Sequence, residues 1–432
     1  MKRTLSLLLA FALAFALGLS LLSGCAQVSA AKELTAPKLS VNPSNSEEVN
    51  GALAGFGLEL LKKTRDANGE TAMNSDMDHV PFSTLVSPLS VALALSMTAN
   101  GAAGNTLAQF QDMLGGGVDL VELNTACAQL MADYRGLGSS TKCAIANSLW
   151  VDPEGQIKDE FIGQCRGIYD AQVFSAQLSE PGIVKDLNGW VSQHTNKMIP
   201  EIIDQPFPEE TACLLVNALY LKNSWLSEFD PLSTHTMDFH HAGGPDSQVE
   251  YLRKFDTQLS YLQGKGAQGV VLPYDDGRLA FVAILPDLYP DSPDFGQWLN
   301  NLEGNSLSQL INNREDATFL SFAMPKFSAE WKGNLEDTLP LLGLEDAFVP
   351  GAADFSSLGD NPEGYFINQV IHATKIEVNE KGTEAAAATV VAAESGAAAP
   401  PQEGITLILD RPFLYGIVDL YTGVPLFLGT YE

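Results

Sequence analysis

The chain has 432 residues, 45% of them apolar, which is enough for a large core and by length alone allows two or three domains. It carries 24 Lys and Arg against 53 Asp and Glu, a formal net charge of −29. A surface this acidic argues against nucleic acid and anionic lipid as partners and favours basic proteins, although acidity can also serve solubility alone. No Pro/Gly-rich linker divides the chain between residue 50 and the stretch that begins at 380, and the sequence has no internal repeat.

The N-terminus has the pattern of a secretory signal. Lys2 and Arg3 precede an apolar run over 5–22, and the chain then reads Ser-Gly-Cys up to Cys25. A run of this length can also span a membrane. A positive start, an apolar centre and small residues at the end are nevertheless typical of a signal peptide.

The residues that close this run, Leu-Ser-Gly-Cys, resemble a bacterial lipobox. The resemblance implies cleavage before Cys25 and a diacylglycerol on its sulfur, and two acyl chains suffice for stable anchoring. We therefore expect a signal peptide over 1–24 and a lipidated Cys25 at the start of a flexible tether over 25–49. The protein is then exported across the cytoplasmic membrane and held by the lipid on an extracytoplasmic or cell surface.

Four further cysteines show no C-x-x-C spacing and lack the density of a disulfide scaffold: Cys127, Cys143, Cys165 and Cys213. Cys213 lies in an apolar run over 212–221, and we expect it to be a small core residue. The sequence leaves open whether the four are free thiols.

Helical periodicity over 188–199 and alternating strands over 269–274, 279–285 and 318–322 predict an α+β fold with mainly antiparallel sheets. Residues 264–269 read G-x-G-x-x-G. A strand-like run that ends in proline follows, where the dinucleotide fingerprint needs a helix, so we expect a hairpin loop.

Other signs of catalysis or metal binding are weak. His235, His240 and His241 with Asp238 lack the i, i+4 spacing of a helical zinc pair, so we expect a polar loop and no metal. The chain has no G-x-S-x-G elbow and no P-loop. We therefore expect neither an enzyme nor a cofactor.

The stretch 380–404 is unusual because almost every residue from Thr383 to Ala399 is small or β-branched. Such a segment has too little apolar bulk to form a core of its own. Its composition fits a flexible linker, and the four alanines over 385–388 fit one or two helical turns. Alternate residues from Thr383 to Val391 would also form one small face of a strand. The stretch is therefore a candidate for a loop that becomes a strand.

Residues 377–389, EVNEKGTEAAAAT, closely resemble the hinge of the reactive-centre loop of inhibitory serpins. Further stretches resemble serpin motifs in the family's order. They read SPLS at 87–90, LNGWV at 187–191, VNALYLK at 216–222, ADFS at 353–356, VIHAT at 370–374, RPFLY at 411–415 and PLFLG at 425–429. The resemblance covers roughly residues 50–432.

The resemblance implies one domain over 50–432 with the serpin fold. That fold has three mainly antiparallel β-sheets, about eight or nine helices and an exposed reactive-centre loop, here at about 380–404, in a monomer. It also implies an inhibitor of serine proteases, with cysteine proteases possible as targets. The protease attacks the loop and forms an acyl-enzyme, and the freed hinge then inserts into the main sheet as a new strand.

The same resemblance assigns the hinge to Glu380, Gly382, Thr383, Glu384, Ala385, Ala386, Ala387, Ala388 and Thr389. Gly382 is expected to give backbone freedom, and Thr383 is expected to enter the sheet first after cleavage. Ser87, Ser90, Asn217, Trp225 and His372 match buried structural positions that the family has in the regions called the shutter and the breach.

Counting forward from the hinge places the reactive bond at Gly396–Ala397, with Glu394, Ser395 and Ala398 as alternatives. Small residues there suit proteases with shallow apolar pockets, of the elastase or subtilisin kind. Residues 382–410 contain no Arg or Lys, which argues against trypsin-like targets, while Glu394 keeps a glutamate-specific protease open.

Two other functions stay open. The first is a non-inhibitory binding protein with the serpin fold, although such members often carry bulky, charged or proline residues in the hinge. The second is a lipid-anchored solute-binding or adhesion protein, in which 380–404 would be a linker.

Overall fold

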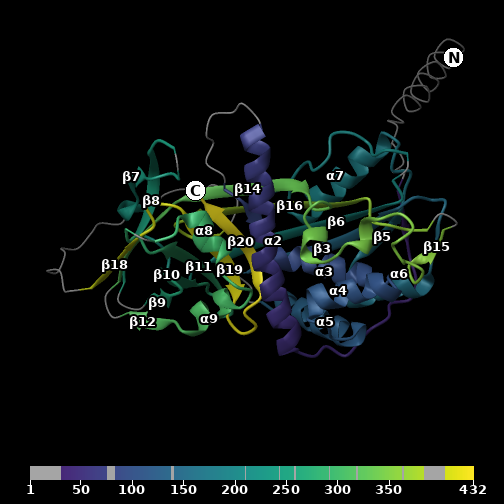
Figure 1. Ribbon diagram of the computed structural model, residues 1–432, viewed down its shortest axis with the longest axis horizontal. Coiled ribbons are helices and arrows are strands. Elements are labelled where there is room, and N and C mark those ends of the chain that lie inside the picture. The colour runs from purple at the N-terminus through teal and green to yellow at the C-terminus, as the bar shows by residue number, and fades with distance from the viewer. Residues whose placement is uncertain are drawn as a thin grey trace, which may run out of the picture.

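A computed structural model describes residues 31–74, 83–137, 141–209, 211–242, 244–256, 259–290, 292–317, 320–361, 364–383 and 404–432. These residues form eight α-helices, three sheets of four or more mainly antiparallel strands, and one small two-stranded sheet (Figure 1). The expected α+β fold with three main sheets is confirmed.

Helix α3 (Pro88–Ala99) is buried along its whole length, which explains its continuous run of small and apolar residues. Pro88 stands at its first turn, where the missing amide hydrogen costs nothing. The other helices are α2 (Glu47–Asn74), α4 (Gly104–Gly115), α5 (Leu120–Arg135), α6 (Asp159–Ile168), α7 (Gly182–His194), α8 (Phe295–Asn300) and α9 (Ser306–Asn312). Helix α7 stops short of the expected residue 199 because Asn196 and Lys197 adopt left-handed backbone angles, with φ of 51° and 65°.

The main sheet has seven strands in the order β1-β5-β3-β6-β17-β16-β14. These are β1 (Lys32–Leu34), β5 (Gln172–Ser175), β3 (Lys142–Val151), β6 (Cys213–Ser224), β17 (Gly382–Thr383), β16 (Gln369–Asn379) and β14 (Phe327–Asn334). The short β17 therefore lies between the two long central strands β6 and β16.

The second sheet has the order β12-β9-β10-β11-β19-β20-β2. Its strands are β12 (Glu315–Ala317), β9 (Leu259–Gly264), β10 (Ala267–Pro273), β11 (Leu279–Pro286), β19 (Phe413–Asp419), β20 (Pro425–Tyr431) and β2 (Leu85–Val86). The third has the order β18-β13-β8-β7, with β18 (Ile405–Ile408), β13 (Leu320–Pro325), β8 (Ser247–Asp256) and β7 (His235–Phe239). Strands β4 (Gln156–Ile157) and β15 (Gly359–Asp360) form the small sheet. The third sheet lies at one end of the molecule and helices α3 to α7 at the other (Figure 1).

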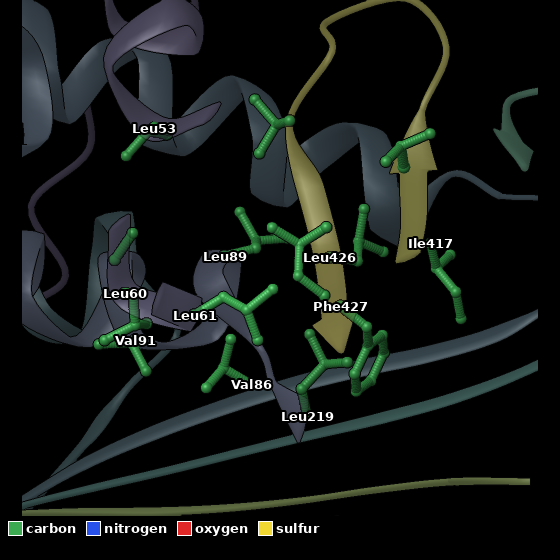
Figure 2. Close-up of a cluster of buried hydrophobic side chains, with 14 of the residues drawn as sticks. Leu53, Leu60, Leu61, Val86, Leu89, Val91, Leu219, Ile417, Leu426 and Phe427 are labelled. Carbon is green, nitrogen blue, oxygen red and sulfur yellow. The ribbon is translucent and has the colours of Figure 1, made fainter. Parts of the chain in front are cut away.

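The largest core joins the N-terminal helices to the C-terminal strands. Leu53 and Leu61 of α2 and Leu89 of α3 gather near Leu426 and Phe427 of β20 (Figure 2). Each of these five side chains is at most 1% exposed. Because burying one such side chain stabilises the fold by about 1.5–3 kcal/mol, the C-terminal hairpin is an integral part of the domain.

Strands β6 and β16 are joined differently along their length. At one end 214–218 of β6 pair in parallel with 369–373 of β16. At the other end β17 separates the strands and pairs with both. Between these ends, 219–222 and 374–377, all described by the structure, are not paired with each other. We call this unpaired stretch the central slot; at about 3.3 Å per residue it is roughly 13 Å long.

The segment that leads into the domain is docked. Strand β1 pairs with β5 at the edge of the main sheet. Leu39 donates its amide to the Gly163 carbonyl at 2.9 Å, and a Cβ on Gly167 would lie 1.7 Å from the Leu39 carbonyl oxygen. Gly163 and Gly167 of α6 lie against this segment, and the absence of side chains there leaves room for its backbone. The expectation of a flexible tether over 25–49 is therefore wrong for residues 31–49, which belong to the fold.

No helix in the described ranges has the length and apolar character needed to cross a membrane. The apolar run over 5–22 and Cys25 lie outside those ranges.

Candidate functional site

The described part of the expected hinge comprises Glu380, Gly382 and Thr383. Its continuation, Glu384 to Thr389, and the expected reactive bond at Gly396–Ala397 with its alternatives lie outside the described residues. The geometry of the site therefore rests on the first hinge residues and on the strands that receive them.

Gly382 occupies a position that only glycine can take. Its φ is +155°, and an added Cβ would lie 2.0 Å from the Asn223 carbonyl oxygen of β6. Gly382 pairs with Ser224 on one side and with Asn379 on the other. The glycine is needed because a third backbone enters here between two strands.

Thr383 is already a strand residue. It pairs with Asn223 of β6 and Val378 of β16 and is 0% exposed. Its Oγ1 shares a hydrogen bond of 2.5 Å with the hydroxyl of Tyr274, whose pKa is raised by burial, so that the phenol stays neutral. The expectation that Thr383 enters the sheet only after cleavage is therefore wrong, because a small hydroxyl side chain finds both space and a partner there.

Trp225 holds the turn that precedes the hinge. Its indole Nε1 donates to the Asn379 carbonyl at 2.8 Å, and its backbone amide donates to the Lys381 carbonyl at 2.9 Å. The ring stacks on Tyr274 with centroids 4.8 Å apart and an interplanar angle of 6°. One buried aromatic pair thus contacts both the turn and Thr383.

Glu380 fastens the outer side of the same turn. Its carboxylate accepts hydrogen bonds from Lys326 Nζ and Thr234 Oγ1, each at 3.1 Å. Burial alone raises the pKa of Glu380, but the backbone hydrogen bond and those from Lys326 and Thr234 outweigh it and lower the pKa below its usual value. We call this assembly of Glu380, Gly382, Thr383, Trp225 and Tyr274 the hinge end of the slot.

The opposite end of the slot brings together four of the residues named from the sequence: Ser87, Ser90, Asn217 and His372. The Ser87 amide donates to His372 Nε2 at 3.0 Å, and Ser90 Oγ donates to Asn217 Oδ1. His372 and Asn217 are opposite each other in the register of β16 and β6. We call this group the shutter end.

His372 is a buried, neutral histidine. It is 1% exposed, and burial lowers its pKa to about 3. Its Nε2 accepts from Ser87, so the ring proton resides on Nδ1, which has no hydrogen-bond partner among the described residues. Ser87 Oγ donates to the Leu426 carbonyl at 2.7 Å and not to His372, so these two residues do not form a nucleophile–base pair.

Several hinge-end residues were missed by the sequence reasoning. Asn223 donates through Nδ2 to Asp276, and Thr141 Oγ1 donates to Asn223 Oδ1 at 2.9 Å, so a polar network lies beside Thr383. Tyr274 and Lys326 complete the contacts of the hinge. No local signal marks Asn223, Thr141 or Tyr274, because each meets the hinge only through the tertiary fold.

The remaining candidate motifs have structural roles. Lys265 and Gly266 form the expected hairpin between β9 and β10. His235 and Asp238 lie in strand β7 rather than in the expected polar loop, because 235–239 pair with 247–251 of β8. His240 pairs with Asp246 at 2.9 Å, which raises the pKa of His240. Within the described ranges, no group of three or more His, Cys, Asp or Glu side chains could hold a metal ion.

The four described cysteines are free thiols: Cys127, Cys143, Cys165 and Cys213. Burial raises the pKa of Cys127 to about 11 and those of Cys143 and Cys213 to about 12, and it raises that of Cys165 as well. Because the thiolate is the reactive form, these raised pKa values keep the thiols protonated at neutral pH.

Comparison with known proteins identifies the family. The sequence model of the Serpin (serine protease inhibitor) family matches residues 52–432. The chain is 29% identical over 420 residues to plasminogen activator inhibitor 1 of Neovison vison, across 96% of this chain and 97% of that protein. It is 33% identical over 358 residues to Serpin-ZXA of Oryza sativa subsp. japonica, across 79% of this chain and 88% of that protein.

The fold agrees with solved structures. The crystal structure of the thermophilic serpin tengpin in its native state has a TM-score of 0.81 at 32% identity, with coverage of 93% of this chain and 98% of that one. The latent state of tengpin gives a TM-score of 0.73 at 31% identity, with 90% and 99% covered. Serpins are in general protease inhibitors and not enzymes. This chain belongs to the serpin family.

Proposed function

We propose that the chain is an irreversible suicide inhibitor of serine endopeptidases of the elastase or subtilisin kind. The observation that carries the proposal is β17, in which Gly382 and Thr383 already form a strand between β6 and β16. A sheet that holds the first two residues of the loop in this way has the geometry to accept the residues that follow.

The chemistry at the bait loop is acyl transfer to the protease. The catalytic serine of the protease attacks the carbonyl carbon before the reactive bond, expected at Gly396. A C–O ester bond forms, the C–N bond breaks, and the amine of Ala397 leaves with a proton delivered by the protease's general acid. The protease is then covalently attached to the hinge side of the cut.

Cleavage releases the hinge side of the loop to lengthen β17. A strand over 382–396 would extend about 50 Å at 3.3 Å per residue. It would first fill the central slot and then separate the paired ends of β6 and β16 at the shutter end. The uncut protein is thus metastable, and its lifetime depends on a kinetic barrier. The acylated protease is carried the length of the sheet and its active site is distorted.

Export and lipid anchoring belong to the same proposal. The signal-like run over 5–22 and the lipobox-like ending at Cys25 support a bacterial lipoprotein. Because Ala31 is docked through its amide on Asp186, roughly 20 Å of extended chain at most would separate Cys25 from this part of the fold. The inhibitor would therefore act close to the membrane. Mass spectrometry of the mature N-terminus should find a diacylglyceryl group on Cys25, and an unmodified soluble protein would contradict this part.

The function is tested by incubating the full chain with an elastase-class protease. We expect a complex that survives SDS, together with cleaved inhibitor that unfolds at a higher temperature than the uncut protein. Cleavage that yields neither a complex nor added thermal stability would instead favour a non-inhibitory binding protein. The cut site follows from the mass of the C-terminal fragment, which also decides between Gly396 and its neighbours.

A further inference from the structure

The turn between β10 and β11, residues 274–278, touches the main sheet where the hinge enters it. The Asp275 amide donates to the Ser224 carbonyl at 3.0 Å. Ser224 is the residue of β6 that pairs with Gly382. A turn of the second sheet therefore supports the end of β6 that lies beside the hinge.

Asp276 in this turn uses its two carboxylate oxygens in different directions. Its Oδ1 accepts hydrogen bonds from the amides of Arg278, at 2.7 Å, and Leu279, at 2.8 Å. Its Oδ2 accepts a hydrogen bond from Asn223 Nδ2 and lies 3.2 Å from the Thr141 hydroxyl. Asn223 and Thr141 are both buried. One carboxylate thus joins the turn to β6 through Asn223 and to the residue that precedes β3 through Thr141.

Arg278 makes the same turn a fixed support. Its Nε donates to Asp419 at 2.8 Å, and its guanidinium also donates to Asp133 of α5 at 2.8 Å. The guanidinium carbon lies 5.6 Å from the ring centroids of both Tyr134 and Tyr421. Asp419 is 0% exposed. The turn is therefore fastened to α5 and to the C-terminal hairpin, neither of which belongs to the main sheet.

Strands β3 and β6 form a unit that has to turn if β17 grows. Residues 142–151 pair with 213–222 without interruption, so the two strands move together. At the shutter end this unit is paired with β16, whereas at the hinge end β17 already separates them. An added strand needs about 4.8 Å at a point roughly 30 Å from Asn223, which corresponds to a rotation of roughly 9°. Asn223 stays in place during such a rotation, so the hinge end is its pivot.

We propose that Asp276 is a positioning residue for loop insertion, which holds Asn223 and Thr141 in place while β3 and β6 turn about the hinge end. This inference rests on the proposed function, because the rotation is required only if the loop inserts. Without the contact, the end of β6 would be free to move away from β16 as a whole. Thr383 would then lose the strand residue with which it pairs. Asp276 acts through Asn223 and not at the reactive bond.

The position of Asp276 predicts an effect on one step of inhibition. The protease cuts the bait loop before insertion, so the rate at which uncut inhibitor disappears should not change. Insertion should slow about tenfold, as expected when a hydrogen bond to a charged group is lost. The ratio of released, cleaved inhibitor to trapped complex should therefore rise about tenfold, and the Thr383 amide of the uncut protein should exchange its hydrogen faster.

The test compares the full chain of wild type with Asp276→Ala, Asn223→Leu and the double variant against one elastase-class protease. Asn223→Leu removes the contact from the strand side and leaves the hydrogen bonds within the turn intact. Each single substitution should raise the ratio about tenfold, and the double variant should be no worse than either, because both remove the same contact. Asp152→Ala is the matched control, since Asp152 accepts the Glu154 amide at 2.9 Å in a turn beyond the opposite end of β3. It should trap as wild type does.

A conservative variant separates positioning from general damage to the turn. Asp276→Asn keeps an oxygen for the turn amides and offers Nδ2 to Asn223 Oδ1 once the Asn223 amide turns over. It should bring the ratio back to within about twofold of wild type. If Asp276→Asn is as impaired as Asp276→Ala, the contact with Asn223 does not act as proposed.

Trapping at the wild-type ratio in both Asp276→Ala and Asn223→Leu would overturn the positioning role and leave the proposed function standing. Effects that add in the double variant would also overturn it, as would an equal loss in Asp152→Ala. If wild type forms no covalent complex, the proposed function fails. Hydrogen exchange of the Thr383 amide in uncut Asp276→Ala then decides separately whether Asp276 holds the hinge end, and exchange at the wild-type rate would show that it does not.

Discussion

The two ends of the central slot differ in how strands β6 and β16 are joined. At the hinge end, β6 and β16 are already separated by Gly382 and Thr383, and the inserted hydroxyl has a partner in Tyr274. At the shutter end, the same two strands are paired directly, and the His372 Nδ1 and Thr374 Oγ1 beside them have no hydrogen-bond partner among the described residues. A buried polar atom without a partner costs about 1–3 kcal/mol.

For the proposed insertion of the loop, this difference assigns a separate role to each end of the slot. At the hinge end, the buried hydroxyl of Thr383 already has a hydrogen-bond partner. The antiparallel pairing of β17 with β6 and β16 sets the direction in which a longer strand would run. At the shutter end β6 and β16 pair directly, and the His372 Nδ1 and Thr374 Oγ1 near them have no hydrogen-bond partner among the described residues. The sheet also lacks the additional strand that a longer β17 would supply. We infer that the hinge end sets where insertion begins and that opening of the shutter end sets how fast it proceeds.

The largest effect should come from Thr383→Arg at the hinge end. The side chain is 0% exposed, and an unpaired charge at this position costs several kcal/mol in every state in which residue 383 is inserted. The variant should be cleaved by the protease without trapping it, so the stoichiometry of inhibition should rise by an order of magnitude or more. Thr383→Val, of similar size, is the control and should still trap; trapping by the arginine variant at the wild-type level would refute the insertion mechanism.

His372 makes the shutter end sensitive to acid. Its folded pKa is about 3, against about 6.5 in an unfolded chain, so between these values only the unfolded state binds the proton. The contribution of the neutral, buried His372 to the free energy of unfolding is therefore complete above pH 6.5. It is lost as the pH falls toward 3, by up to roughly 4 kcal/mol. Acid unfolding curves should show this loss in wild type and in the control His235→Gln, an exposed histidine, and much less of it in His372→Gln. Identical curves for all three proteins would show that His372 does not govern the acid response.

Gly382→Ala should expel the hinge from the sheet. The new Cβ would lie 2.0 Å from the Asn223 carbonyl oxygen at a φ of +155°. Gly277→Ala is the matched control, because Gly277 also has a positive φ of +73° but has nothing within 4 Å of the added Cβ, so that it measures backbone strain of about 1–2 kcal/mol alone. Hydrogen exchange at the Thr383 amide should be faster only in Gly382→Ala; equal exchange in both variants would mean that the close approach of the strands is relieved at no cost.

The smallest effect should come from Glu380→Gln, which removes the ion pair with Lys326 at 3.1 Å. A partly exposed pair of this kind contributes up to about 1 kcal/mol, so Thr383 should exchange only a few-fold faster. Lys375→Gln breaks a comparable pair with Glu330, also at 3.1 Å, between β16 and β14 and should leave the hinge unchanged. A response in Lys375→Gln equal to that in Glu380→Gln would show that the pair at the turn is not specific to the hinge.

The sequence predicted the fold class and several residues of both ends, because ordered motifs and the small-residue stretch are local patterns. It did not predict that Thr383 is already inserted, since that depends on Tyr274 and Asn223 from distant strands. The polar segment over 31–46 resembled a tether. It is docked because glycines in α6 admit its backbone, a non-local fit that composition does not encode.

Growth of β17 through the slot after cleavage can be followed by hydrogen exchange before and after a cut in the bait loop. The amides of 219–222 and 374–377 are not paired across the slot in the uncut protein. Because the same residues pair with β3 and β14 on their outer sides, insertion would supply partners only to the amides that point into the slot. We expect these slot-facing amides to become strongly protected in the cleaved wild type and to stay unprotected in cleaved Thr383→Arg. Equal exchange of these amides in cut and uncut wild type would show that no strand enters the slot after cleavage.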